Sequence, residues 1–120
     1  MVGLEYNKKK QQFNLIYDRG RLARGSLLYM KMMPNGMGFS RYGSIVSRRI
    51  GKAVVRNKVK RRLREIMRRA ELKPGWDIVI YTRRMVAVAR YDDLRNMILG
   101  LLSKAQLLVE RYEGTSPGAD

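Results

Sequence analysis

The chain has no cysteine and no histidine, and only ten acidic residues and three prolines. Without cysteine there is no disulfide framework and no thiolate metal site, which fits a reducing cytoplasm. Without histidine the chain lacks the usual general base for RNA cleavage and the commonest metal ligand. A stand-alone ribonuclease of the paired-histidine type is therefore excluded. We expect no catalytic residue and no metal ligand in this protein.

Long hydrophobic runs are also missing. No apolar stretch approaches the roughly 18 residues that a membrane-spanning helix needs, and no signal peptide opens the chain. We therefore expect a cytoplasmic protein that makes no contact with a membrane. With 120 residues, of which 45% are hydrophobic, the chain is long enough for one domain with a modest core.

Positive charge is what the chain has in excess. Lys and Arg number 26, the formal net charge is +16, and the sequence pI is about 10.8. Between Arg41 and Arg69, twelve cations accompany one acid, Glu65. So many like charges repel one another unless a polyanion neutralises them, and the polyanion that best fits such a run is nucleic acid.

The apolar periodicity predicts one domain over residues 1–113, with a mobile arm over residues 1–6 and a disordered tail over 114–120. The predicted order is α-β-β-β-α-β-α. This order indicates an α+β fold, a two-layer α/β sandwich in which helices cover one face of a four-stranded sheet. We predict a loop over residues 21–25. The predicted helices are 7–19, 53–70 and 91–109, and the predicted strands are 26–33, two strands within 38–49, and 76–82.

The helix predicted over residues 53–70 separates its apolar side chains from its basic ones. At 100° per residue, one arc about 100° wide holds a core-facing stripe, which consists of Val59, Leu63, Ile66, Met67 and Ala70. The opposite side holds Asn57, Arg61, Arg64 and Arg68, with Lys58 and Lys60 on its two flanks. Arginine has a planar fork that fits phosphate oxygens, so this side is the candidate RNA-binding surface.

The run GKAVVRNKVKRRLRE over residues 51–65 resembles the signature of the protein subunit of bacterial ribonuclease P. That signature is an Arg-Asn-Arg/Lys triplet, preceded by Gly-x-Ala-Val and followed by hydrophobic-Lys-Arg. The flanking segments resemble the family in the same order, namely FNLIYDRG at 13–20, RYG at 41–43, VSRRIG at 46–51 and GWDIV at 75–79. The resemblance covers roughly residues 7–109.

The resemblance implies a sandwich with a left-handed β-α-β crossover, against the usual right-handed rule. It also implies that the protein does not perform the chemistry. In this family a catalytic RNA with bound magnesium removes the 5′ leader of precursor tRNA. The protein binds that RNA through the signature helix and holds the leader in a cleft between the first helix and the sheet. The implied partners are therefore the catalytic RNA and precursor tRNA. No protein partner is evident, the protein itself holds no cofactor, and the holoenzyme requires magnesium.

Carried over by position, the resemblance implies two groups of site residues. The catalytic RNA would be bound by Arg56, Asn57, Lys58, Lys60, Arg61 and Arg64, with Arg68 on the same side of the helix. The leader cleft would be lined by Phe13, Tyr17, Arg48 and Arg49. Lys58 stands where arginine is common and keeps the charge without the fork. Tyr17 stands where phenylalanine is common and still allows base stacking.

Other interpretations of the same residues remain. The spacing of Phe13, Ile16 and Tyr17 is also typical of core packing. A ribosomal or other structural RNA-binding protein would have the same charge and size, without a reason to reproduce the ordered signature. A DNA-binding regulator would use the basic helix in a major groove, but the sequence has no second helix at helix-turn-helix spacing. A protein-only nuclease is the weakest alternative because the carboxylates are few and scattered.

Overall fold

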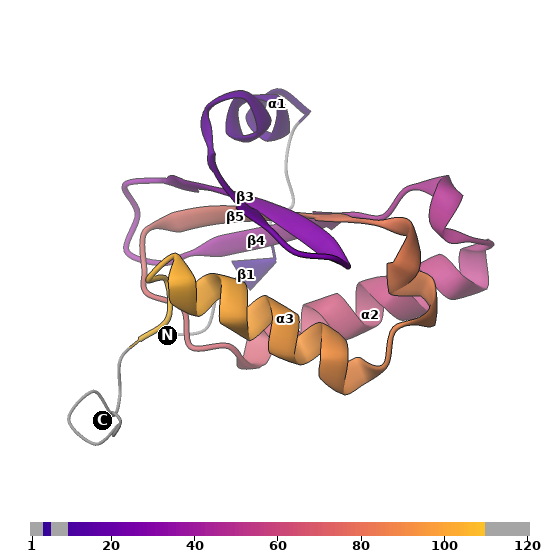
Figure 1. Ribbon diagram of the computed structural model, residues 1–120. Coiled ribbons are helices and arrows are strands. Elements are labelled where there is room, and N and C mark those ends of the chain that lie inside the picture. Colours follow the sequence, from indigo (N-terminus) through magenta and orange to yellow (C-terminus); the bar gives the residue numbers. More distant parts are fainter. Residues whose placement is uncertain (1–3, 6–9, 110–120) are drawn as a thin grey trace, which may run out of the picture.

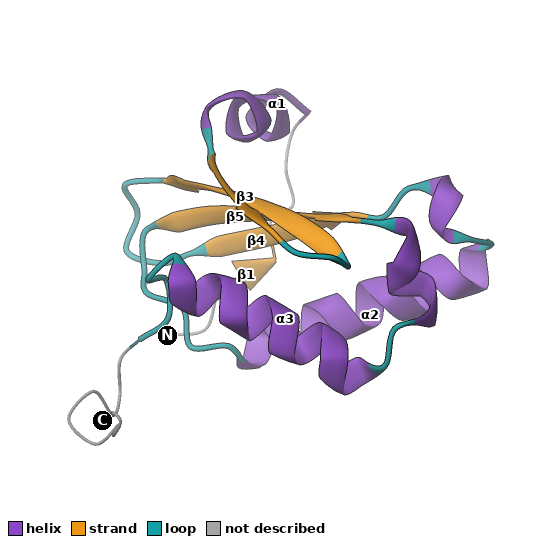
Figure 2. Cartoon of the chain, viewed as in Figure 1, coloured by secondary structure: helices purple, strands orange, loops and turns teal. Residues whose placement is uncertain are grey.

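The computed structural model describes residues 4–5 and 10–109, which form one sheet with helices on both faces (Figure 1). Helices, strands and loops alternate along the chain (Figure 2). The strands are β1 (Leu4–Glu5), β2 (Arg21–Arg24), β3 (Leu28–Pro34), β4 (Arg41–Ile45) and β5 (Trp76–Thr82). The α-helices are α1 (Lys10–Arg19), α2 (Ala53–Arg69) and α3 (Tyr91–Lys104), and two short 3-10 helices are η1 (Arg48–Ile50) and η2 (Arg84–Val88).

The strands lie in the order β1-β4-β5-β3-β2. Strand β3 is antiparallel to both β2 and β5, whereas β4 is parallel to β5 and to β1. Helix α2 connects the neighbouring parallel strands β4 and β5, so the predicted strand–helix–strand unit is confirmed. The left-handed sense of this crossover stays a prediction.

The main core lies between the sheet and the helices α2 and α3 (Figure 1). Alternate residues of β3 and β5 point to this side, as expected for strands with a period of two. Each of them is at most 1% exposed: Leu28, Met30, Met32, Ile78 and Ile80. The predicted stripe of α2 is confirmed, because all five of its residues are buried against them: Val59, Leu63, Ile66, Met67 and Ala70.

Helix α1 lies on the opposite face of the sheet, which corrects the expectation that the helices cover one face only (Figure 1). Ile16 is 2% exposed and packs against Val79 and Tyr81 of β5. The other side of β3 carries Tyr29 and Met33, so both faces of the central strands hold large apolar groups that need cover. The two-layer sandwich therefore gains a short third layer.

From α1 onward the α-helices and strands follow the predicted order, but β1 precedes them and several segments differ from their predicted structure. Residues 21–25, predicted as a loop, contain β2. The prediction missed this strand because an edge strand rich in arginine shows no apolar alternation. Residues 38–49 hold one strand and the start of η1 rather than two strands. Helix α3 ends at Lys104, since Gln106 adopts a positive φ of 63°.

The sheet has five strands rather than four, because two residues of the predicted mobile arm form β1. The rest of that arm lies outside the described residues, as do the predicted start of α1 at Asn7 and the tail over 114–120.

A buried ion pair joins the beginnings of β4 and β5. Asp77 is 7% exposed and accepts hydrogen bonds from Arg41 Nε at 2.9 Å and Nη2 at 2.7 Å. Asn35 Nδ2, in the β3–β4 connection, donates to Asp77 Oδ1 at 2.9 Å. Arg41 and Asp77 are also register partners in the sheet. This carboxylate therefore fixes the connection and the register together.

We expect Asp77→Ala to lower the free energy of unfolding by about 2–3 kcal/mol, because Arg41 and Asn35 lose a buried acceptor. Urea denaturation measures the loss. The matched control is Glu65→Ala, which breaks the exposed 3.2 Å pair between Glu65 and Arg69 and is expected to cost less than about 1 kcal/mol. Similar small losses in both variants would contradict a structural role for Asp77.

Candidate nucleic-acid interface

The outer side of α2 forms a continuous basic surface. The helix has 17 residues, with eight Lys or Arg and one acid, and its first turn holds no acidic residue. Its N-cap residue, Lys52, makes no side-chain capping bond, so the positive end of the helix dipole adds to the cations. The exposed members of the predicted RNA-binding set are Asn57, Lys58, Arg61, Arg64 and Arg68. The structure brings these side chains to one surface, as predicted.

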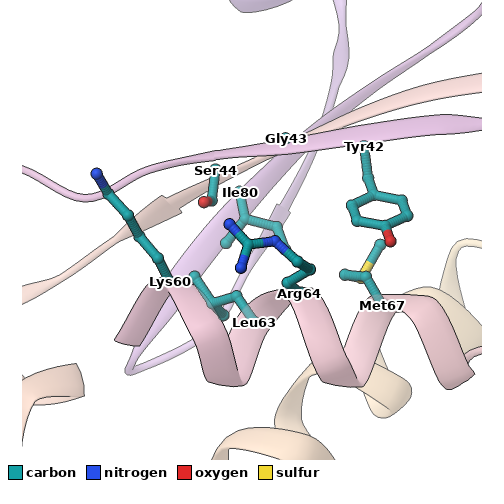
Figure 3. Close-up of a pocket in the computed structure, with 8 residues that line it drawn as sticks. All are labelled: Tyr42, Gly43, Ser44, Lys60, Leu63, Arg64, Met67 and Ile80. Carbon is teal, nitrogen blue, oxygen red and sulfur yellow. The ribbon is translucent and has the colours of Figure 1, made fainter. Parts of the chain in front are cut away.

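Lys60 and Arg64 lie on the flank of α2 that faces β4. Figure 3 shows both side chains extending from the helix toward the strand, near Ser44. Beneath these side chains, a small cavity of about 10 Å³ lies between the helix and the sheet. This volume is room for about one water molecule. The predicted RNA-binding residues thus fall on an outward side and on a flank that faces β4.

Arg56, the first residue of the signature triplet, is placed differently from the other cations. Its side chain is half-buried, and its Nε donates to the carbonyl oxygen of Gly51 at 3.1 Å. Asn57 and Lys58 are exposed beside it. The triplet therefore contains one side chain that holds the local backbone and two that face solvent.

A row of tyrosines runs across the face of the sheet that carries α1. The ring of Tyr17 meets the ring of Tyr81 edge-on at 5.6 Å, and Tyr81 stacks on Tyr29 at 4.9 Å with an angle of 10°. Lys31 Nζ lies 4.8 Å from the centre of the Tyr17 ring and donates to the Tyr17 carbonyl at 2.7 Å. Rings beside cations are suited to stacking bases and pairing with phosphates.

An open groove of about 470 Å³ continues from the end of this row. Its lining combines one ring, three arginines, two hydroxyl groups and one apolar residue, namely Tyr29, Arg49, Arg83, Arg84, Ser47, Thr82 and Ile50. The Arg83 guanidinium lies 5.1 Å from the centre of the Tyr29 ring. The groove is therefore a cationic site with one aromatic wall, suited to a nucleotide chain.

The four predicted cleft residues are not equivalent in the structure. Tyr17 is 49% exposed, so one side of its ring is accessible. Phe13 is half-buried and packs with Ile16 and its neighbours, close to the core-packing alternative. Arg49 lines the groove, whereas Arg48 is exposed on the same short helix without lining it.

Sequence reasoning missed four residues that complete this face: Tyr29, Lys31, Tyr81 and Arg83. A signal for the first two was present in the alternation of residues 28–33. Leu, Met and Met point to the main core, and Tyr, Lys and Met point away from it. A lysine in that second set indicates a face that is only partly covered.

Within residues 4–5 and 10–109 no group of three or more His, Cys, Asp or Glu side chains is arranged to hold a metal ion. The same residues contain no helix long and apolar enough to cross a membrane.

Comparison with known proteins gives consistent matches. Residues 7–106 match the sequence profile of the family described as Ribonuclease P. The ribonuclease P protein component of Dehalococcoides mccartyi strain CBDB1 is 41% identical over 108 residues, 90% of either chain. That of Caldanaerobacter subterraneus subsp. tengcongensis is 40% identical over 106 residues, 87% of this chain and 91% of that one. The solved ribonuclease P protein of Thermotoga maritima aligns with a TM-score of 0.76 at 32% identity, over 82% of this chain and 96% of that one.

The tyrosine row predicts a loss of stability at high pH. Burial, reinforced by Tyr29 and Tyr17, raises the pKa of Tyr81 from 10.0 to about 12. The folded state keeps the proton longer than the unfolded state, so this contribution is complete below pH 10 and is lost as the pH rises toward 12. We expect Tyr81→Phe to lose less stability than the wild type over that range. Urea denaturation at pH 9 and pH 12 measures the difference, and equal losses would contradict the raised pKa.

Proposed function

This chain belongs to the ribonuclease P family as its protein component, and we propose that it binds a catalytic RNA through α2 and the 5′ leader of precursor tRNA along the α1 face. In this function it assists the endonucleolytic removal of the leader, which gives the mature 5′ end of the tRNA. We propose that removal of the leader takes place in the cytoplasm, where precursor tRNA is made.

The observation that carries the proposal is the placement of two different nucleic-acid surfaces on one small sheet. Helix α2 presents exposed cations and few rings, which suits the phosphates of a folded RNA. The opposite face presents stacked tyrosines that lead into an arginine-lined groove, which suits unpaired nucleotides. A leader is single-stranded and varies in sequence, and stacking tolerates that variation.

Catalysis in this proposal belongs to the RNA. The chain has no histidine, and the described carboxylates form no metal-binding cluster. We propose that the RNA–protein holoenzyme requires magnesium and that the protein itself holds no cofactor. The protein supplies affinity and orientation: α2 neutralises phosphates of the catalytic RNA, and Tyr17, Tyr29 and Arg49 hold the leader.

The alternative of a ribosomal or other structural RNA-binding protein is not favoured. The family profile covers residues 7–106, and the relatives are named as ribonuclease P protein components.

The proposal is tested by cleavage of a 5′-extended precursor tRNA at low magnesium, using a bacterial ribonuclease P RNA with and without this protein. We expect the protein to restore cleavage at the correct site and to cleave nothing alone. Cleavage by the protein without RNA would contradict the assignment of the chemistry to the RNA. Tight binding of the RNA without restored cleavage would favour the structural RNA-binding alternative.

Leader binding predicts a specific effect of Tyr17. We expect Tyr17→Ala to reduce the preference of the holoenzyme for precursor over mature tRNA about 5- to 150-fold, the equivalent of one lost base stack of about 1–3 kcal/mol. Tyr17→Phe keeps the ring and is the matched control, so it retains the preference. Affinities for tRNA with and without a leader provide the measurement. An equal loss of affinity for both substrates would place Tyr17 outside the leader site.

A further inference from the structure

Arg56 is the half-buried member of the signature triplet, and its contact is with the protein itself. Its Nε donates to the carbonyl oxygen of Gly51 at 3.1 Å. Its backbone amide donates to the carbonyl of Lys52 at 3.0 Å, in the first turn of α2. Exposed cations such as Lys58 and Arg61 lie within about a turn and a half on the same helix. Burial and the contact with Gly51 set Arg56 apart from them.

Gly51 is the point at which the backbone changes direction between η1 and α2. Its φ of 154° and ψ of −167° lie in a region that only glycine adopts without strain. A Cβ at this position would lie 3.1 Å from the Cβ of Val55, so the helix also approaches the backbone closely. A turn of this kind has no side chain of its own to hold it. The guanidinium of Arg56 contacts this turn from α2, by donating a hydrogen bond to the carbonyl oxygen of Gly51.

The same residue connects Arg56 to the arginine-lined groove. The amide of Gly51 donates to the carbonyl of Arg48 at 3.3 Å, and the amide of Arg49 donates to Ser47 Oγ at 3.2 Å. Ser47, Arg49 and Ile50 all line the groove. A short path of hydrogen bonds therefore runs from the signature helix through Gly51 to the backbone that carries Arg49.

We infer that Arg56 is a positioning residue that holds η1, and with it Arg49 and the wall of the groove, at a fixed place relative to α2. The inference rests on the proposed function, because it assigns the groove to the leader and α2 to the catalytic RNA. Arg56 then acts on leader recognition through Gly51 and η1. Its charge adds little to the binding of the catalytic RNA.

The competing role for Arg56 is a direct contact with an RNA phosphate, and the two roles require different features of the side chain. A phosphate contact requires the positive charge, and its loss lowers the salt dependence of RNA binding. The bond to Gly51 requires an N–H donor at the fourth position from Cα. Glutamine has an uncharged N–H donor at that position, so Arg56→Gln keeps the donor and removes the charge, whereas Arg56→Ala removes both.

The experiment compares the full-length wild-type protein with Arg56→Gln, Arg56→Ala and the control Arg61→Ala. Arg61 is an exposed cation on the same helix, and its removal deletes one charge without touching Gly51. Two quantities are measured: the dependence of affinity for ribonuclease P RNA on salt, and the preference of the holoenzyme for tRNA with a leader over mature tRNA.

For a positioning role, we expect Arg56→Ala to reduce the leader preference at least 5-fold, and Arg56→Gln to keep it within 2-fold. The salt slope of both variants stays near that of the wild type. Arg61→Ala shows the reverse pattern, because its slope decreases by about 0.7–0.9 for one lost phosphate contact while its leader preference is unchanged.

Two results would overturn the inference. One is a decrease in salt slope for Arg56→Gln as large as that of Arg61→Ala, which would assign Arg56 to a phosphate. The other is equal leader preference in wild type, Arg56→Ala and Arg56→Gln, which would show that Arg56 has no effect on the groove. If Arg56→Ala does not fold, Arg56→Met takes its place, because methionine keeps much of the apolar bulk and lacks the N–H donor to Gly51. A wild-type holoenzyme that shows no leader preference would contradict the proposed function instead.

Discussion

The structure depends on a constraint within α2, which must bury one side and carry eight cations on the others. Repulsion among these charges opposes both the helix and its contact with the rest of a chain of net charge +16. The opposing force is the burial of a continuous apolar stripe, from Val59 to Met67, against β3 and β5. A single surface ion pair, Glu65 with Arg69, relieves little of the repulsion. A bound polyanion would relieve far more, so we expect binding of RNA to stabilise the fold as well.

The two faces of the sheet carry surfaces of different chemistry. Because side chains alternate along β3, Met30 enters the core beneath α2 while Tyr29 and Lys31 reach the α1 face. In the proposed function, the cations on the α2 side contact phosphates of the catalytic RNA. On the other face, rings and cations lie together, as Lys31 over Tyr17 and Arg83 over Tyr29. Because the two faces of the sheet are separate surfaces, one domain can hold two nucleic-acid elements without competition between them.

Sequence reasoning predicted the features that depend on local pattern and missed those that depend on pairing in space. The stripe of α2 and the continuous apolar strand at 76–82 follow from periodicity, and both are confirmed. Strand β2 was missed because its residues gain a pattern only from their pairing with β3. The tyrosine row was missed for the same reason, since Tyr17, Tyr29 and Tyr81 come from three separate segments. The place of α1 was mistaken because a helical stripe indicates a buried side without indicating which face of a sheet buries it.

The path between the two surfaces is short, and this has a consequence for specificity. Strand β4 ends at Ile45 and α2 begins at Ala53, so seven residues carry the backbone from the sheet to the RNA-binding helix. Within them, η1 presents Arg49 to the groove, and Gly51 sets the direction of α2. If this connection were flexible, binding of a leader would have to order it, and affinity would be lost for every substrate that carries a leader. If the connection is already ordered, binding of the catalytic RNA to α2 also fixes the position of the groove. In the proposed function, the distance between the catalytic RNA and the leader is then set by the backbone around Gly51, and glycine is the residue type that this backbone requires.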